Sequence, residues 1–124
     1  MSRKLTRKGL IKKLDRLFSL KIREIGVCEL KGLDNVKCGG GLQCAHIVTR
    51  GRKSLRWNEF NALCLCSGHH VYFTHNPDQW AYEIEKFFPK KWKYVKKHMN
   101  DIWDRDLDKV LLQLQGNKHQ IKKI

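Results

Sequence analysis

Side chains that bind metals or move protons are concentrated in one short part of this chain. Residues 44–70 read CAHIVTRGRKSLRWNEFNALCLCSGHH and hold three of the five cysteines and three of the six histidines. Thiolates and imidazoles are the side chains that proteins use for zinc, and imidazole is also the commonest general base. The pattern predicts a structural metal site, a catalytic site, or both.

Cys66 and His69 have the spacing of a zinc-binding turn. Two residues separate them, so both side chains can bind one tetrahedral ion from a turn that enters a helix. Cys38, which lies beside a run of glycines, and Cys28 can supply the other two ligands. We therefore expect a Cys3His site that holds a structural zinc ion.

Other roles for the cysteines remain open. The interval between the first two cysteines is wide for a zinc knuckle, so Cys44 and Cys64 are alternative ligands, and some thiols could be small buried hydrophobic groups. Five is an odd number, which argues against a complete disulfide framework. A thiol redox function is disfavoured because the chain contains no C-x-x-C pair.

Three further residues indicate a second site with different chemistry: His46, Asn61 and His70. Phosphodiester hydrolysis needs a base that deprotonates water and a cation that stabilises charge on the phosphate and the leaving oxygen. A neutral imidazole can be that base at pH 7, because its unperturbed pKa is about 6.5. An amide oxygen can hold the imidazole in one tautomer, and a second imidazole can bind the ion.

His69 and His70 are adjacent, and this limits how they can be used. Successive side chains of a helix diverge by about 100°, so one site cannot easily use both. We assign His69 to zinc and His70 to a catalytic ion. The alternative is that His46 and His70 are also structural zinc ligands or hydrogen-bonded core histidines.

These residues resemble the motif of the HNH endonuclease superfamily. The segments AHI and LCSGHH, with Asn61 between them, keep the His, Asn, His order and the register of that motif over roughly residues 27–77. The resemblance implies a ββα-metal finger in which His46 is the general base, Asn61 orients it and His70 binds the catalytic ion. LRWNEFNALCLC also resembles phage-encoded HNH nucleases that work beside homologous recombination.

The resemblance also implies the partners and the cofactors. We expect DNA as the substrate, Mg²⁺ or another divalent cation for catalysis, and zinc for structure. Many relatives act as homodimers or with a recombination or packaging protein. A phage-encoded protein would act in the cytoplasm of its bacterial host.

The sequence departs from the family pattern at Ala45. Most relatives have a metal-binding Asp or His before the general base, so the catalytic ion is one ligand short here. His75 follows His70 by five positions and could be the missing ligand, or it could be a surface histidine before a helix cap. Cys44 could also serve, because it should share the strand face of His46.

The elements that must position these residues fall into parts of a single domain, residues 1–124. Residues 5–26 are expected to form a basic amphipathic helix that ends near Gly26, because apolar residues recur there at helical spacing. Residues 27–76 should contain a strand through LQCAHIV, a loop over TRGRKSLRW, a strand near Asn61 to Leu65, and a helix from Ser67.

Residues 77–116 read as helical again. Asn76 and Pro77 provide an N-cap and a first-turn proline, and Pro89 ends the first apolar face. The helical spacing continues as one helix or as two with a break near residues 104–106. Gly116 should end the pattern, leaving residues 117–124 as a basic tail. The fold class expected is therefore α+β, a zinc-stapled ββα-metal finger flanked by amphipathic helices.

The charge balance points to a polyanionic partner. Lys and Arg number 26 against 12 Asp and Glu, giving a formal net charge of +14. Four cations lie in the segment after His46 and are expected to contact the phosphate backbone: Arg50, Arg52, Lys53 and Arg56. No segment reads as membrane-spanning or as a signal peptide, so a cytoplasmic location is expected.

These features together predict a metal-dependent DNA endonuclease. The rival interpretation is a non-catalytic nucleic-acid-binding module with a structural zinc site, and Ala45 is the observation that favours it.

Overall fold

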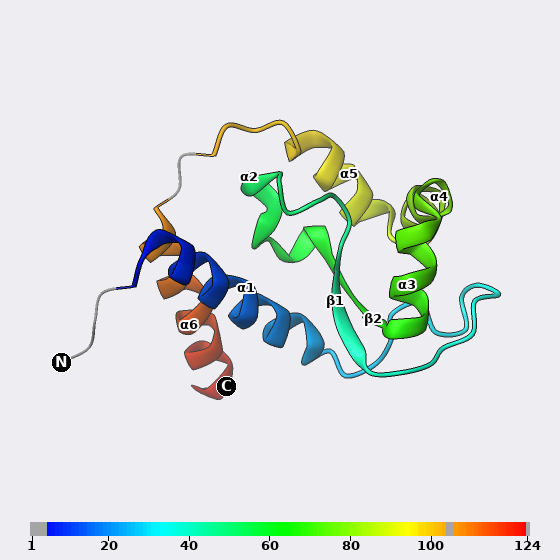
Figure 1. Ribbon diagram of the computed structural model, residues 1–124, viewed down its shortest axis with the longest axis horizontal. Coiled ribbons are helices and arrows are strands. Elements are labelled where there is room, and N and C mark those ends of the chain that lie inside the picture. Colours follow the sequence, from blue (N-terminus) through cyan, green and yellow to red (C-terminus); the bar gives the residue numbers. More distant parts are fainter. Residues whose placement is uncertain (1–4, 104–105, 124) are drawn as a thin grey trace.

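A computed structural model, which describes residues 5–103 and 106–123, has an α+β architecture (Figure 1). A two-stranded antiparallel sheet lies between helices that come from both ends of the chain. The elements in chain order are α1 (Arg7–Arg23), β1 (Leu42–His46), α2 (Lys53–Arg56), a 3₁₀ turn (Glu59–Asn61), β2 (Ala62–Cys66), α3 (Ser67–His75), α4 (Pro77–Phe87), α5 (Pro89–His98) and α6 (Leu107–Lys123).

The order strand, strand, helix predicted for the metal-binding region is confirmed. β1 pairs with β2 so that His46 lies opposite Ala62 and Leu42 lies opposite Cys66, and α3 begins directly after β2. The segment expected as a plain loop between the strands instead contains α2 and the 3₁₀ turn. Leu55 explains the difference, because its burial gives this segment an apolar anchor that favours a helical turn.

Helix α1 forms as its apolar spacing predicts. The hydroxyl of Thr6 caps its first turn by accepting a hydrogen bond from the Gly9 amide at 3.0 Å. Leu14, Phe18 and Ile22 are buried on one face, while the basic side chains are mostly exposed. Gly26 follows the last turn with a φ of +84°, which suits the turn that leaves the helix.

Each face of the sheet is covered by its own core. Ala62 and Cys64 pack against α1 and α6, whereas Leu63 and Leu65 pack against residues of α3, α4 and α5. Successive side chains of a strand point to opposite faces, so β2 is buried at all five positions. Figure 1 shows α1 and α6 together on one side of the sheet, and α3, α4 and α5 lie away from them.

The C-terminal region differs from the prediction in three respects. Pro89 ends the first helix as predicted, but it also starts α5, since proline is favoured in the first turn of a helix. Asn76 makes no side-chain cap; its amide instead donates to the Tyr72 carbonyl at 2.8 Å.

The third difference concerns the end of the last helix. The expected break between helices includes residues 104–105, which lie outside the described residues. Helix α6 does not end at Gly116 but continues to Lys123, because one glycine costs a helix only about 1 kcal/mol. No helix in the described part of the chain has both the length and the apolar character needed to cross a membrane.

Substitution of Leu14 tests whether α1 is an integral part of this fold. Leu14→Ala should lower the free energy of unfolding by about 2–5 kcal/mol, because the side chain is fully buried against β2 and α6. Leu20→Ala on the same helix is the control, since Leu20 is 41% exposed. Urea unfolding followed by circular dichroism measures both; equal losses would contradict this packing.

Candidate metal centre and catalytic pocket

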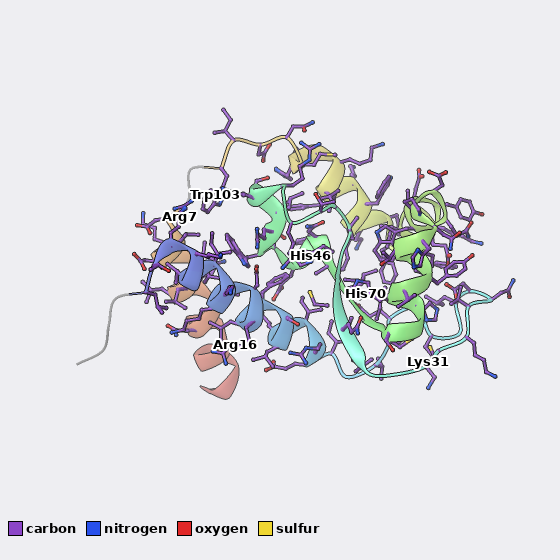
Figure 2. All side chains as sticks on the ribbon, in the orientation of Figure 1. Arg7, Arg16, Lys31, His46, His70 and Trp103 are labelled. Atoms are coloured by element: carbon purple, nitrogen blue, oxygen red, sulfur yellow. The ribbon has the colours of Figure 1, made fainter. Side chains whose placement is uncertain are left out.

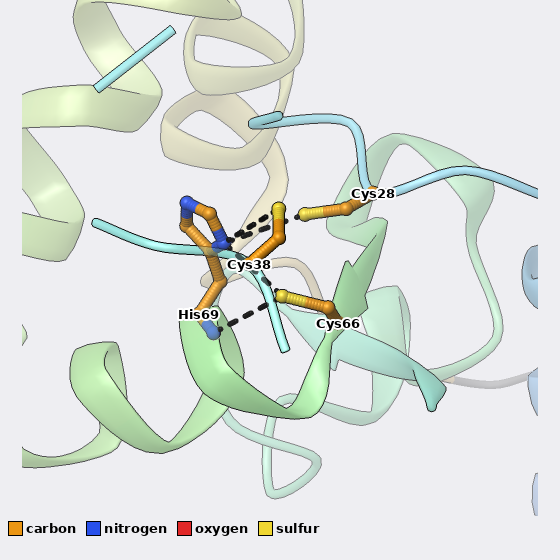
Figure 3. Close-up of side chains that lie close together, drawn as sticks. All are labelled: Cys28, Cys38, Cys66 and His69. Atoms are coloured by element: carbon orange, nitrogen blue, oxygen red, sulfur yellow. Dashed lines mark hydrogen bonds between the residues drawn. The ribbon is translucent and has the colours of Figure 1, made fainter. Parts of the chain in front are cut away.

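The four predicted zinc ligands come together at the junction of β2 and α3 (Figure 3). The donor atoms of Cys28, Cys38, Cys66 and His69 all lie within 4.8 Å of one another. His69 Nδ1 lies 3.6 Å from the sulfurs of Cys28 and Cys38 and 3.2 Å from that of Cys66. Tetrahedral zinc with ordinary bond lengths would place a nitrogen and a sulfur about 3.5 Å apart, so this cluster could hold such an ion.

Close backbone packing between two segments creates the cluster. The Gly68 amide donates to the Gly39 carbonyl at 2.9 Å, and the Ser67 hydroxyl donates to the same carbonyl at 3.0 Å. A side chain at Gly40, whose φ is +78°, would collide with Ser67. The run of glycines therefore lets the loop lie against the start of α3, which brings Cys38 to Cys66 and His69.

The carboxyl group of Asp34, which lies near that of buried Glu83, supports the imidazole of His69. Its Nε2 pairs with Asp34 Oδ1 at 2.9 Å, which leaves Nδ1 directed at the three sulfurs. Metal-binding histidines commonly use such a carboxylate to fix the tautomer. Burial and the neighbouring Asp34 raise the pKa of buried Glu83 to about 7. Glu83 is therefore partly protonated near neutral pH, which weakens the repulsion between the two carboxyl groups.

The surroundings of Cys66 favour the thiolate form of its side chain. Burial alone would raise the pKa of its thiol, but hydrogen bonds from the backbone amides of His69 and Gly39, together with the neighbouring His69 ring, lower it to about 6. The His69 amide lies 3.4 Å from the sulfur, at the N-terminus of α3. A thiolate is the form of cysteine that binds zinc.

The two alternative cysteine ligands lie elsewhere. Cys44 and Cys64 are directly opposite each other in the sheet and belong to the core that faces α1. Burial raises the pKa of Cys44 to about 12, so that side chain remains a neutral thiol. Neither cysteine joins the cluster.

A separate pocket of about 470 Å³ contains both histidines of the predicted catalytic motif. His46 comes from β1 and His70 from α3, and Figure 2 shows both beside β1. The remaining lining residues are Asp15, Ser19, Cys44, Thr49 and Arg50. Cys44 therefore shares the strand face of His46, as predicted.

The imidazole of His46 is held in one tautomer. A carbonyl can only accept, so His46 Nε2 must carry the proton that it donates to the Arg56 carbonyl at 2.9 Å. The lone pair of the neutral ring is then on Nδ1. Burial lowers the pKa of His46, as do the nearby Arg50 and Arg56 charges, against opposing effects of the Arg56 carbonyl and Asp15. The ring is therefore neutral at pH 7.

Asn61 does not orient His46 directly, which corrects the prediction. Its side-chain oxygen accepts from the Val48 amide at 2.8 Å, and its amide donates to the carbonyls of Val48 and Leu55 at 3.2 and 3.1 Å. Asn61 is fully buried, so these bonds satisfy it inside the loop that follows β1. It fixes the shape of that loop, while the Arg56 carbonyl orients the histidine.

The imidazole of His70 is held in the opposite tautomer to that of His46. Its Nδ1 lies 2.5 Å from Gln43 Oε1, an oxygen that can only accept, so Nδ1 carries the proton and Nε2 has the free lone pair. Burial lowers the pKa of His70, which favours the neutral form that binds metals. Gln43 was not identified from the sequence, since no pattern links a strand glutamine to a distant histidine.

His75 is not brought into this pocket. It is exposed at the end of α3, and a separation of five residues turns it by about 140° from His70. Ala45 is 2% exposed in the core that faces α3. The prediction that His75 supplies the missing ligand is therefore unsupported, and Asp15 is the one carboxylate among the lining residues described.

The four predicted phosphate-binding cations have different environments. Arg50 lines the pocket, and Arg56 is paired with Asp15 at 2.6 Å. Arg52 donates to Asn100 at 2.9 Å, and the ammonium of Lys53 lies 5.8 Å from the Trp103 ring centre. Of the four, Arg50 is thus the cation that lines the pocket with the two histidines, and Arg56 forms an ion pair with Asp15.

Comparison of the chain with models of protein families, with curated proteins and with solved structures gave no match in any of the three.

Replacing one ligand tests the metal cluster. Cys66→Ser should remove most of the bound zinc and lower the thermal midpoint, because the serine hydroxyl is a far weaker zinc ligand than a thiolate. Cys44→Ser, in the neighbouring pocket, should keep its zinc. Elemental analysis and thermal denaturation read both variants; equal zinc in the two would contradict the assigned ligand set.

Proposed function

We propose that this protein is a metal-dependent DNA endonuclease of the HNH type. The observation that carries the proposal is a pocket lined by two neutral histidines that hold different tautomers. The free lone pair is on Nδ1 in His46 and on Nε2 in His70. One nitrogen suits a general base and the other suits a metal ligand. A positive guanidinium, that of Arg50, lies beside them.

In the proposed reaction His46 Nδ1 takes a proton from water, and the resulting hydroxide attacks the phosphorus. A divalent ion such as Mg²⁺ bound at His70 Nε2 would supply charge stabilisation for the pentacovalent phosphate and for the departing 3′ oxygen. Mg²⁺ usually keeps several waters and takes phosphate oxygens as ligands, so one histidine with few other protein ligands is compatible with it. Arg50 would hold the phosphate in place.

The surface charge supports a DNA substrate. Helix α1, which contributes Asp15 and Ser19 to the pocket, exposes Arg7, Lys8, Lys12 and Arg16. With a formal net charge of +14, binding should weaken steeply with salt. We place the protein in a reducing compartment such as the cytoplasm, where free thiols persist. The protein could act as a homodimer or with a recombination or packaging protein.

The second candidate function is a non-catalytic nucleic-acid-binding module with a structural zinc site. The burial of Ala45 favours it, because that position provides no metal ligand. This module would bind DNA without cutting it in any divalent metal.

A plasmid-relaxation assay in Mg²⁺ or Mn²⁺ tests the proposal. His46→Ala should lower the cleavage rate by about a hundredfold or more, since general-base catalysis contributes that much. His75→Ala is the matched control, a histidine outside the pocket, and should cut normally. Zinc content should be equal in all three proteins. Full cleavage by folded His46→Ala contradicts the mechanism, and DNA binding without cleavage by wild type supports the binding module.

The pH dependence of cleavage gives a second test. The base must be neutral, and the pKa of free His46 lies below 6.5. Activity should therefore rise as pH increases through the acidic range and approach its plateau near neutral pH. The measurement is kcat/KM against pH at fixed metal concentration. A rise that continues above pH 8 would contradict His46 as the base.

A further inference from the structure

We propose that Asp15 of helix α1 is the positioning residue that fixes the tautomer and orientation of His46. Asp15 lies outside the segment that resembles the HNH motif, and its role was not predicted from the sequence. The inference deepens the proposed function and rests on it for its catalytic meaning. It concerns an arrangement of atoms that can be tested without any cleavage.

The carboxylate of Asp15 holds three side chains of the loop that follows β1. Its Oδ1 accepts from Arg56 Nε at 3.0 Å and from the Trp57 indole at 2.9 Å. Its Oδ2 accepts from Arg56 Nη2 at 2.6 Å and more distantly from Arg50 Nη1 at 3.4 Å. The pair with Arg56 is bidentate, the geometry that is strongest and most specific for a carboxylate and an arginine.

Arg56 connects this carboxylate to His46. The Arg56 side chain is held by Asp15, and the Arg56 carbonyl accepts the Nε2 proton of His46 at 2.9 Å. Trp57, the next residue, is held by the same carboxylate. Three hydrogen bonds to consecutive residues thus fix the peptide whose carbonyl selects the His46 tautomer.

The environment keeps Asp15 in its ionised form. Burial alone would raise the pKa of Asp15, but Arg56, Trp57 and Arg50 together lower it. Its side chain is 22% exposed, so solvent only partly screens these contacts. Asp15 is also the one acidic residue in the sequence of α1, where every other charged side chain is basic. That exception was the available sequence signal for its role.

Without the carboxylate, two consequences should follow. The Arg56 and Trp57 side chains lose their shared acceptor, so the Arg56 carbonyl is no longer fixed beneath His46. Arg50 and Arg56 also lose the negative charge that offsets them. The ring of His46 would then exchange between tautomers or turn, and its Nδ1 would no longer be aligned with the attacking water.

The experiment reads the His46 tautomer directly, by long-range ¹H–¹⁵N NMR on protein without DNA. Wild type should show one neutral form with the proton on Nε2. Asp15→Asn, which keeps the shape but removes the charge, should show a mixture of forms. Glu59→Gln is the matched control, because it removes another ion pair that links α1 to this region, the one with Lys21, and should leave His46 unchanged.

The cleavage assay then separates positioning from binding. Asp15→Asn should lower kcat by about tenfold or more with little change in the KM for DNA, since misplacing a reacting group has such a cost. Asp15→Glu should recover part of the activity. A single Nε2–H form retained in folded Asp15→Asn would overturn this inference. Absence of cleavage by wild type would count against the nuclease alone, because the NMR result does not depend on it.

Discussion

The meeting of four donor atoms at the start of α3 is the constraint on which the rest of the structure depends. Three sulfurs and one imidazole nitrogen lie within 4.8 Å of one another. A bound metal ion would stabilise this close grouping of polar atoms and connect segments that are distant in the sequence. Such a link would join the segment after α1 to the β2–α3 junction. It would hold the first turn of α3 in place, and that turn also contains His70.

Adjacent residues of α3 consequently serve separate sites. His69 is fully buried, with its two nitrogens directed at the sulfurs and at Asp34, while His70 is turned toward β1 and Gln43. The helical rotation of about 100° between neighbours accounts for this division. The candidate metal centre and the proposed catalytic pocket therefore share one turn of helix without sharing a residue.

The ligand pair Cys66 and His69 and the strand, strand, helix order were predictable because they follow from local spacing, whereas Cys28 and Cys38 were inferred from residue type alone. Cys66 and His69 lie in one turn, and the alternation along β1 places Cys44 and His46 on one face. The partners of His46 were not predictable, since Arg56 acts through its carbonyl, which every residue possesses. The side chain of Asn61, which was predicted for that role, bonds instead to backbone groups of Val48 and Leu55.

Contacts between distant parts of the chain were the other source of difference. Asp15 reaches the loop after β1 across 41 positions of sequence, and no spacing rule anticipates such a pair. His75 was expected near His70 from sequence proximity, but helical rotation directs it away. The relative positions of side chains were predictable where a single helix or strand determines them, and they were not predictable where two distant segments meet.

The most direct test of this account is X-ray absorption at the zinc edge of the purified protein. A Cys3His zinc centre should give three sulfur neighbours at about 2.3 Å and one nitrogen at about 2.0 Å. The same spectrum should be obtained when both His46 and His70 are replaced by alanine. A coordination shell of nitrogen and oxygen alone, or a shell that changes in the double variant, would contradict a Cys3His metal centre that is separate from the pocket of His46 and His70.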